Sequence, residues 1–521
     1  MTAAISGPAI RWRGALLPVA MGLAATGLVL WHLFVPTTIG TSDTGDGPRL
    51  MCQLNVADLH ELPRGANSAQ RFVALHYDSV RPPPYCHFRS GIRYPTSAVV
   101  VVAAGKVITD WFEPAGGLDM RVVGALYALL YGAAIGLLTL LLPGPTWARG
   151  AIAGIFAVLG ADGAFVPYFI SPYSEPTEYI ALLLSICGLL ALWRRPVVAT
   201  WKLILVTLAF AALLTSKTQD VPLIVVLAAA LLSVRSPIGR SLTGRLTGRL
   251  LPAIAAGALI AVSALTLQLQ PRSFNQTLVW SDVFYTILYD SPHPQADLRD
   301  LGVPTEMARF AGQTFYQAYP VAHRDPQYQV FLRRVRLSDV ALFYIRHPGR
   351  MATVAGSAAA AVAHARYDLP NTLRSDSSRP FSVCRICFIT RAGEAVSPQT
   401  PNRPPTSSGL TNALFPGWLL AVGVAGAVLV RRRWPEREWR AFGLLLVTLP
   451  PMALIMFFAA ILGDGYAELA KHVFGTVVVT WLAIPLLLLA VVGIAEATVR
   501  TCRGGVGGVA IPPWRPPSWC R

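Results

Sequence analysis

The chain has 521 residues, of which 54% are hydrophobic and only 14% are charged, and its mean hydropathy is +0.49. A soluble globular protein carries roughly 25% charged residues, so this composition excludes an ordinary soluble enzyme. Apolar runs recur along the chain, and each is about long enough to cross roughly 30 Å of hydrocarbon. Because helices satisfy their own backbone hydrogen bonds in lipid, the sequence predicts an all-α polytopic membrane protein.

The net charge is +17, which in a soluble protein would suggest nucleic-acid binding. Here the arginines cluster in short loops between apolar runs, as the positive-inside rule expects. The sequence has no Walker A motif, zinc-finger spacing or basic-aromatic groove pattern. Membrane topology therefore accounts for the charge, and we expect no nucleic-acid partner.

The apolar runs predict about ten spans. The first is too long for the core of a signal peptide and has no A-x-A-like site after it, so we expect a retained span. Two weaker stretches, Ala98 to Ile108 and Met351 to Ala365, need a separate decision. The ten predicted spans are about 14–35, 119–142, 150–170, 177–193, 200–216, 220–235, 250–270, 411–430, 441–462 and 473–498.

The arginine distribution decides the orientation. If neither weak stretch crosses, every arginine-rich short loop lies in the cytoplasm, including SVRSPIGRSLTGRLTGRLL with its four arginines. If both cross, several of these loops face outward, which opposes the charge bias. We therefore expect the weak stretches to be interfacial or re-entrant helices on the outer face, and both termini to be cytoplasmic.

This threading divides the chain into three parts. Residues 1–270 form a membrane body with a long first outer loop, 36–118. Residues 271–410 form an outer-face cap that includes the irregular stretch SPQTPNRPPTSSG. Residues 411–521 contain the last spans and a cytoplasmic tail. Neither outer segment is expected to have a large core of its own.

Polar residues concentrate in four turns on the predicted outer face. Charge at a span centre costs roughly 2.5–3.5 kcal/mol per residue, so charges persist near membranes when they pair, line a wet cavity or do chemistry. Three of the turns also have a purely structural explanation: a helix cap at SDTGDG, a helix start at SEPTE and an ion pair at ELAKH. The four turns offer Asp43, Asp46 and Arg49; Ser171, Tyr173, Ser174, Glu175 and Glu178; Lys217, Gln219 and Asp220; and Asp464, Glu468, Lys471 and His472.

At these turns the motifs SDTGDGPRLM, SPYSEP, SKTQ and GDGYAELAKHVF resemble those of bacterial membrane hexose transferases of surface-polysaccharide and S-layer glycan assembly. Those proteins are similar to the GT-C superfamily, which has many spans, a long first outer loop with an essential acid, and polyprenyl-phosphate-linked sugar donors. The resemblance implies a GT-C-like bundle in the plasma membrane. It also implies hexose transfer, with inversion, to a cell-envelope glycan or glycolipid acceptor at the outer face.

The resemblance also implies roles for single residues. Asp43 or Asp46 would be the general base on the acceptor hydroxyl, with Asp43 favoured because it lies nearer the span. The donor phosphate would be held by positive charge positioned in advance. Its cationic ligands would be Arg49, Lys217, Lys471 and His472, and the residues that bind sugar hydroxyls or orient these cations would be Glu175, Glu178, Gln219, Asp464 and Glu468.

A divalent cation is a further consideration. Asp43, Asp46, Glu175 and Asp464 carry the hard oxygen ligands that such an ion prefers. Many polyprenyl-phosphate-sugar transferases of this class need no metal, so the sequence assigns none.

Three other functions compete with a transferase. A lipid-linked glycan transporter or flippase usually shows inverted repeats and broken helices at mid-membrane, and no such symmetry is visible. A glycan polymerase or ligase would share the architecture and differ in using an oligosaccharide diphosphate donor. A scaffold would not need so many ionisable groups on one face.

Four of the seven cysteines, Cys52, Cys86, Cys384 and Cys387, fall on the predicted outer side. An even number in an oxidising compartment allows two disulfides. SVCRICF is also a C-x-x-C motif, but no zinc-like second pair accompanies it, so we expect a structural role.

Overall fold

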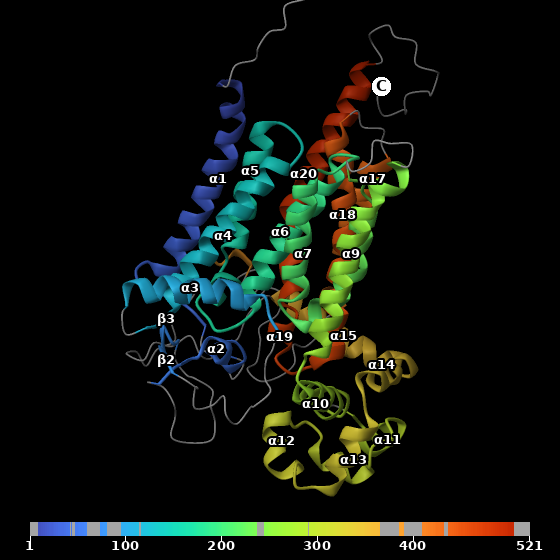
Figure 1. Cartoon of the computed structure of the whole chain (residues 1–521). Coiled ribbons are helices and arrows are strands. Elements are labelled where there is room, and N and C mark those ends of the chain that lie inside the picture. Colours follow the sequence, from blue (N-terminus) through green and yellow to red (C-terminus); the bar gives the residue numbers. More distant parts are fainter. Residues whose placement is uncertain are drawn as a thin grey trace, which may run out of the picture.

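A computed structural model describes residues 9–41, 43, 47–59, 73–80, 95–113, 116–236, 244–289, 291–364, 385–389, 409–431 and 436–504. The described chain is helical apart from one small sheet, as predicted. Long helices form a bundle, and a lobe of short helices extends from one end of it (Figure 1). The start of α1 and the end of α20 lie at the opposite end of the bundle (Figure 1).

Helices occupy all ten predicted spans. Seven described helices are long and apolar enough to cross a membrane, and the other three predicted spans correspond to shorter apolar helices. The seven are α1 (Ala9–Phe34), α4 (Met120–Leu141), α6 (Glu175–Trp193), α9 (Gly244–Gln268), α17 (Gly409–Arg431), α18 (Arg437–Asp464) and α20 (Phe474–Gly504). The shorter three are α5 (Thr146–Gly160), α7 (Thr200–Leu214) and the pair η3 (Thr218–Leu223) and α8 (Ile224–Leu232).

One predicted boundary is wrong. The span predicted over 150–170 ends at Gly160, and a separate short 3-10 helix, η2 (Val166–Phe169), follows it. The buried Asp162 accepts the backbone N–H of Ala164 at 2.9 Å, which closes a turn after α5. The apolar residues of the turn and η2 extend the hydrophobic run although the helix has ended.

The two weak apolar stretches are helices outside the set of membrane-crossing candidates. α3 (Ala98–Phe112) lies across the bundle near the end that carries the lobe (Figure 1). One side of α3 exposes Val100, Val107 and Trp111, whereas Lys106 pairs with Asp110 at 2.9 Å. This polarity is typical of a helix at a membrane interface. α15 (Pro348–His364) packs at the same end against α17, α19 (Leu469–His472) and α20.

The first loop contains a small antiparallel sheet that the sequence did not predict. Its order is β1 (Val56–Ala57), β2 (His76–Ser79), β3 (Gly117–Asp119), with Val56 opposite Ser79 and Tyr77 opposite Leu118. The strands are two to four residues long, too short to show a period-2 pattern. Because β3 runs directly into α4, the sheet ties the first loop to the bundle.

The lobe packs around a buried aromatic cluster that is continuous with the core of the bundle. The indole of Trp280 lies at ring-centroid distances of 4.1 Å from Phe284, 5.4 Å from Phe310 and 5.8 Å from Phe331. These aromatics come from short helices with no sustained period, which hid the core from hydropathy. The lobe consists of α10 (Arg272–Trp280), the π-helix η4 (Ser281–Ile287), α11 (Pro294–Asp300), η5 (Thr305–Phe310), α12 (Phe315–Ala322), α13 (Pro326–Arg334) and α14 (Leu337–Arg346).

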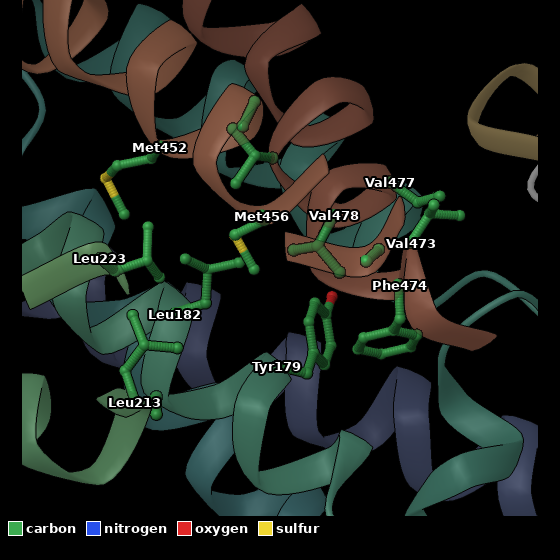
Figure 2. Close-up of a cluster of buried hydrophobic side chains, with 14 of the residues drawn as sticks. Tyr179, Leu182, Leu213, Leu223, Met452, Met456, Val473, Phe474, Val477 and Val478 are labelled. Carbon is green, nitrogen blue, oxygen red and sulfur yellow. The ribbon is translucent and has the colours of Figure 1, made fainter. Parts of the chain in front are cut away.

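A buried apolar cluster joins the ends of five elements near the lobe (Figure 2). Tyr179 and Leu182 of α6 lie there with Met456 of α18 and Phe474 of α20, and Figure 2 also labels Leu213, Leu223, Met452, Val473, Val477 and Val478. In lipid, close packing of such side chains supplies the van der Waals contacts that hold helices together. The cluster therefore fixes the start of α6, η3 and α20 relative to one another.

Cys52 and Cys387 are each disulfide-bonded, whereas Cys187 in α6 is a buried free thiol. Cys86 and Cys384 lie outside the described residues. The short segment 385–389 docks on the bundle: Arg385 donates to the His32 carbonyl at 2.7 Å, and the Ile389 N–H donates to Asp162 at 2.9 Å. A structural role for the disulfides fits this docking.

Candidate functional site

A cavity of about 840 Å³ lies where the bundle meets the lobe. Its volume falls within the range of about 300–1,000 Å³ that is typical of ligand pockets. All four polar turns contribute to its lining, together with α10, α14 and the end of α9. Of the nine binding residues predicted from the sequence, eight line it: Arg49, Glu175, Lys217, Gln219, Asp464, Glu468, Lys471 and His472.

Lys217 is the centre of a buried ion-pair cluster. Glu175 and Glu178 lie one turn apart at the start of α6, and the Lys217 Nζ is 2.9 Å from a carboxylate oxygen of each. The three side chains are 10%, 2% and 0% exposed, in the order Lys217, Glu175, Glu178. Burial lowers the pKa of Lys217, but the charges of Glu175 and Glu178 outweigh burial and raise that pKa above its usual value. Lys217 therefore stays charged.

Glu178, the ninth predicted binding residue, lies behind the cavity wall and supports it. A Cβ at Gly475 would lie 2.3 Å from the Glu178 Oε1, so only glycine lets α20 begin this close to the carboxylate. Asp220 adds a third buried acid: its Oδ2 accepts from the Ser216 hydroxyl at 2.8 Å, and its Oδ1 has no hydrogen-bond partner among the described residues. The cluster thus holds more acids than bases.

The last polar turn is locked to η4. Gly465 has φ +57°, a conformation that favours glycine, and a Cβ there would lie 2.0 Å from the Thr286 Oγ1. The Tyr466 N–H donates to the same hydroxyl at 2.8 Å. Asp464, just before this turn, is thereby held at the cavity.

The basic residues after this turn have acidic or aromatic neighbours. The Lys471 Nζ is 3.0 Å from the Glu468 Oε2 and lies 4.5 Å from the centroid of the Tyr173 ring. The Nδ1 of His472 is 3.2 Å from both the Asp464 Oδ2 and the Gln219 Oε1. The ion pair expected at ELAKH is the one between Glu468 and Lys471, whereas His472 faces Asp464.

Gln219 holds His472 from two sides. Its amide nitrogen donates to the His472 carbonyl at 3.0 Å, while its amide oxygen faces the ring nitrogen. This contact joins the start of η3 to α19, two segments far apart in the chain.

Arg49 brings the first loop to the lobe. It lies in α2 (Pro48–Leu54), and its guanidinium carbon is 3.7 Å above the centroid of the Phe274 ring in α10. A cation over an aromatic face at this distance contributes about 0.5–2 kcal/mol. Both residues line the cavity, so this stack forms part of its wall.

The two predicted catalytic acids have different positions. Asp46 lies outside the described residues. Asp43 is 8% exposed, its Oδ1 accepts the Gly47 N–H at 2.9 Å, and it is not among the described residues that line the cavity. A Cβ at Gly47 would lie 2.4 Å from the Asp43 Oδ2 and 2.9 Å from Pro172, a lining residue. The Asp43 carboxylate therefore lies close behind the wall and caps the start of α2.

One acid that sequence reasoning missed lies beside the cavity. Asp282 in η4 is fully buried, and neither carboxylate oxygen has a hydrogen-bond partner among the described residues. Burial, with a smaller effect of the Asp464 charge, raises the pKa of Asp282 well above its usual value. Its neighbours Ser281 and Tyr285 line the cavity. The available signal was a lone acid in the aromatic stretch WSDVFYTILYD, and π-helices are frequent at functional sites.

No metal centre is visible in the part of the chain that the structure describes. Within these ranges, no group of three or more His, Cys, Asp or Glu side chains could hold an ion. Asp43, Glu175 and Asp464 therefore do not form a metal site with described residues.

The fold and the site define a polytopic all-α membrane protein with a charged cavity at one end of its bundle. The chain belongs to the family described as the YfdI N-terminal transmembrane domain, which matches residues 10–504. None of the curated proteins compared with the chain matches it in sequence.

Two solved structures illustrate its similarity to larger proteins. One is the archaeal oligosaccharyltransferase AglB from Archaeoglobus fulgidus in complex with an inhibitory peptide and a dolichol-phosphate, at 14% identity and a TM-score of 0.37. Another is the apo form of the Archaeoglobus fulgidus oligosaccharyltransferase, at 15% identity and a TM-score of 0.38. Each match covers 95% of this chain and 53% of the other, so the chain spans about half the length of these proteins.

Proposed function

We propose that this protein is a GT-C-type membrane glycosyltransferase. It moves a hexose from a polyprenyl-phosphate donor to a cell-envelope glycan or glycolipid acceptor, with inversion, at the outer face of the plasma membrane. The observation that carries the proposal is the convergence of eight motif residues, from four distant turns, on one cavity. Random scatter of polar residues among helix ends would not bring both the cations and the hydroxyl-binding groups together.

The cations divide by how firmly each is held. Lys217 is buried between two glutamates, and releasing it would strand both charges. The Glu468 partner of Lys471 is half exposed, Arg49 lies over the Phe274 ring, and both cations line the cavity. We therefore assign Arg49 and Lys471 as direct ligands of the donor phosphate, with Lys217 positioning Glu175.

Glu175, Asp464 and Gln219 provide acceptors and donors for sugar hydroxyls on the cavity wall. In the proposed step a carboxylate takes the proton of the acceptor hydroxyl, and the acceptor oxygen bonds to C1 of the hexose. The bond from C1 to the phosphate oxygen breaks on the opposite face, which inverts the configuration. The lipid phosphate leaves with the electron pair and is stabilised by Arg49 and Lys471.

The first-loop acids remain the proposed base, under one geometrical condition. To reach an acceptor hydroxyl, the Asp43 carboxylate must give up the Gly47 N–H that it accepts. The transfer activities of Asp43→Asn and Asp46→Asn are compared with that of Glu175→Gln on the cavity wall. Loss of activity in a first-loop variant supports the proposed base, whereas loss in Glu175→Gln alone would assign the base to the wall carboxylate.

The test is direct turnover by the purified protein. It is incubated with a panel of polyprenyl-phosphate hexoses and an acceptor extract, and release of the lipid phosphate is followed. We expect one donor to turn over, Arg49→Ala and Lys471→Ala to reduce donor use at least tenfold, and Lys106→Ala, in a half-exposed pair outside the cavity, to retain activity. No turnover with any donor, together with movement of lipid-linked sugars across liposomes, would favour a transporter.

A further inference from the structure

The large cavity has two walls of different chemistry. Its described acids and bases belong to the first loop, α6, the turn before η3 and the last polar turn, and we call them the charged wall. The lobe contributes eleven of the described lining residues, between positions 274 and 341, and we call these the lobe wall. None of the eleven is an acid, a lysine, an arginine or a histidine.

The composition of the lobe does not account for this absence of charge. Residues 272–346 contain eight arginines and seven acids. None of those whose side chains the structure describes lines the large cavity, and Asp282, although next to the lining residue Ser281, is fully buried. The described part of the lobe therefore carries its charges elsewhere and presents a neutral face to the cavity.

The lobe wall carries neutral groups that can form hydrogen bonds. The Asn275 amide, the Tyr285 hydroxyl and the Ser338 hydroxyl make no hydrogen bond to any described residue. Their donors and acceptors are therefore open to a ligand in the cavity. The neutral polar residues of the lobe wall are Asn275, Thr277, Ser281, Tyr285, Thr314 and Ser338.

The rest of the lobe wall is apolar. The Phe315 ring lies at centroid distances of 5.1 Å from Tyr319 and 6.2 Å from Trp280, so the aromatic cluster of the lobe holds it in place. A sugar has apolar C–H faces and a rim of hydroxyls, and a wall that mixes aromatic surface with neutral polar groups matches both. An isoprenoid tail would leave the polar groups unpaired. The apolar residues are Phe274, Leu278, Phe315, Leu337 and Ala341.

The cations of the charged wall are already engaged. The Lys217 Nζ is 2.9 Å from each of two glutamates, and Arg49 and Lys471 are the proposed ligands of the donor phosphate. The remaining base, His472, is 3.2 Å from Asp464. A carboxylate on the acceptor would therefore lose water in the cavity without gaining a cationic partner, and the acids of the charged wall would repel it.

We propose that the lobe wall binds the acceptor through uncharged sugar units, so that the hexose is added to a neutral stretch of glycan. This inference rests on the proposed transferase function and goes beyond it by naming the class of acceptor. Asn275, Tyr285 and Ser338 determine the specificity: they bind hydroxyls of the acceptor, and the lack of a cation beside them excludes uronic acids.

The reaction product reports the charge of the acceptor. The full-length protein in nanodiscs is incubated with the acceptor extract and the panel of polyprenyl-phosphate hexoses, labelled in the sugar. Partial acid hydrolysis of the product gives labelled di- and trisaccharides, which are passed over an anion exchanger. We expect at least tenfold more label in the unbound fragments than in the bound ones, because the units next to the added hexose are neutral.

The result also separates this inference from the transferase function. Label in bound fragments at an equal or higher level would overturn the neutral acceptor and leave the transferase intact. No labelled product from any donor would count against the transferase, and the inference that rests on it would fall too.

A double variant tests the lobe wall itself. Asn275→Ala/Ser338→Ala should raise the KM for the acceptor at least fivefold and change the KM for the donor less than twofold. The matched control, Gln295→Ala/Gln329→Ala, removes two neutral polar side chains from the lobe outside the cavity and should change neither KM. All four residues are exposed, so both variants should fold as the wild type does. A rise in the donor KM instead would assign the lobe wall to the lipid tail, and an equal effect of the control would overturn the assignment.

Discussion

Replacing Lys217 by methionine should be among the most damaging single changes in the site. Methionine keeps much of the length of the side chain but removes the charge that lies 2.9 Å from Glu175 and from Glu178. The two carboxylates are 2% and 0% exposed, so the Lys217 ammonium group is their main compensating charge.

The expected magnitude follows from the burial. Breaking a buried ion pair by removing one partner costs about 3–5 kcal/mol, because the other charge is left without compensation. An exposed helix pair contributes only about 0.3–0.5 kcal/mol. We therefore expect Lys217→Met to lower the free energy of unfolding by about 3–5 kcal/mol. Lys106→Met, which breaks the half-exposed pair with Asp110, should lower it by less than about 1 kcal/mol.

Cys187 provides the readout. Its thiol is free and buried in α6, the helix that carries both glutamates, so it reacts with a maleimide only after that helix is released. Pulse labelling during a denaturant titration in mixed micelles, with Cys502 and Cys520 replaced by serine, gives the free energy of unfolding of each variant.

A rescue variant separates stranded charge from lost packing. Lys217→Met/Glu175→Gln/Glu178→Gln removes the stranded carboxylates and should recover most of the stability, because a neutral replacement of a buried pair is often tolerated. The reasoning is refuted if Lys217→Met stays within about 1 kcal/mol of the wild type, or if the triple variant is no more stable than the single one.

Three further changes test other parts of the site. Gly465→Ala forces a Cβ towards Thr286 at φ +57° and should cost about 1–3 kcal/mol by the same labelling assay, whereas Gly463→Ala, with open space at its Cβ, should be nearly neutral; equal effects would contradict the locked turn. The raised pKa of Asp282 means that, as pH rises above the unfolded value of about 3.9, the unfolded state loses a proton that the folded state keeps, so stability falls. Asp282→Asn should therefore raise the unfolding midpoint relative to the wild type more at pH 8 than at pH 4; a pH-independent difference would argue against a proton held there. Asp43→Asn should abolish hexose transfer with normal expression, and full activity in membranes would remove Asp43 as the base.

The local composition of the sequence was sufficient to predict the helices of the membrane body. A run of apolar residues predicts a helix in lipid because the backbone has no other way to satisfy its hydrogen bonds, and helices occupy all ten predicted spans. Counting spans also placed the four polar turns on one side, and the structure brings residues from all four to one cavity. The boundary at Gly160 was missed because apolar residues continue after the helix ends.

Tertiary packing decided how those residues act. From the sequence alone, Lys217 could bind either a phosphate or the two glutamates. The structure pairs it with Glu178, against which α20 packs at Gly475. Asp43 is held near Gly47, whose N–H donates to its carboxylate, and does not line the cavity. The Trp280 core and the buried Asp282 depend on contacts between short helices that carry no periodic signal. Hydropathy adds up along the chain and therefore reports which segments enter the membrane, whereas the chemistry of each polar group depends on neighbours that are distant in sequence.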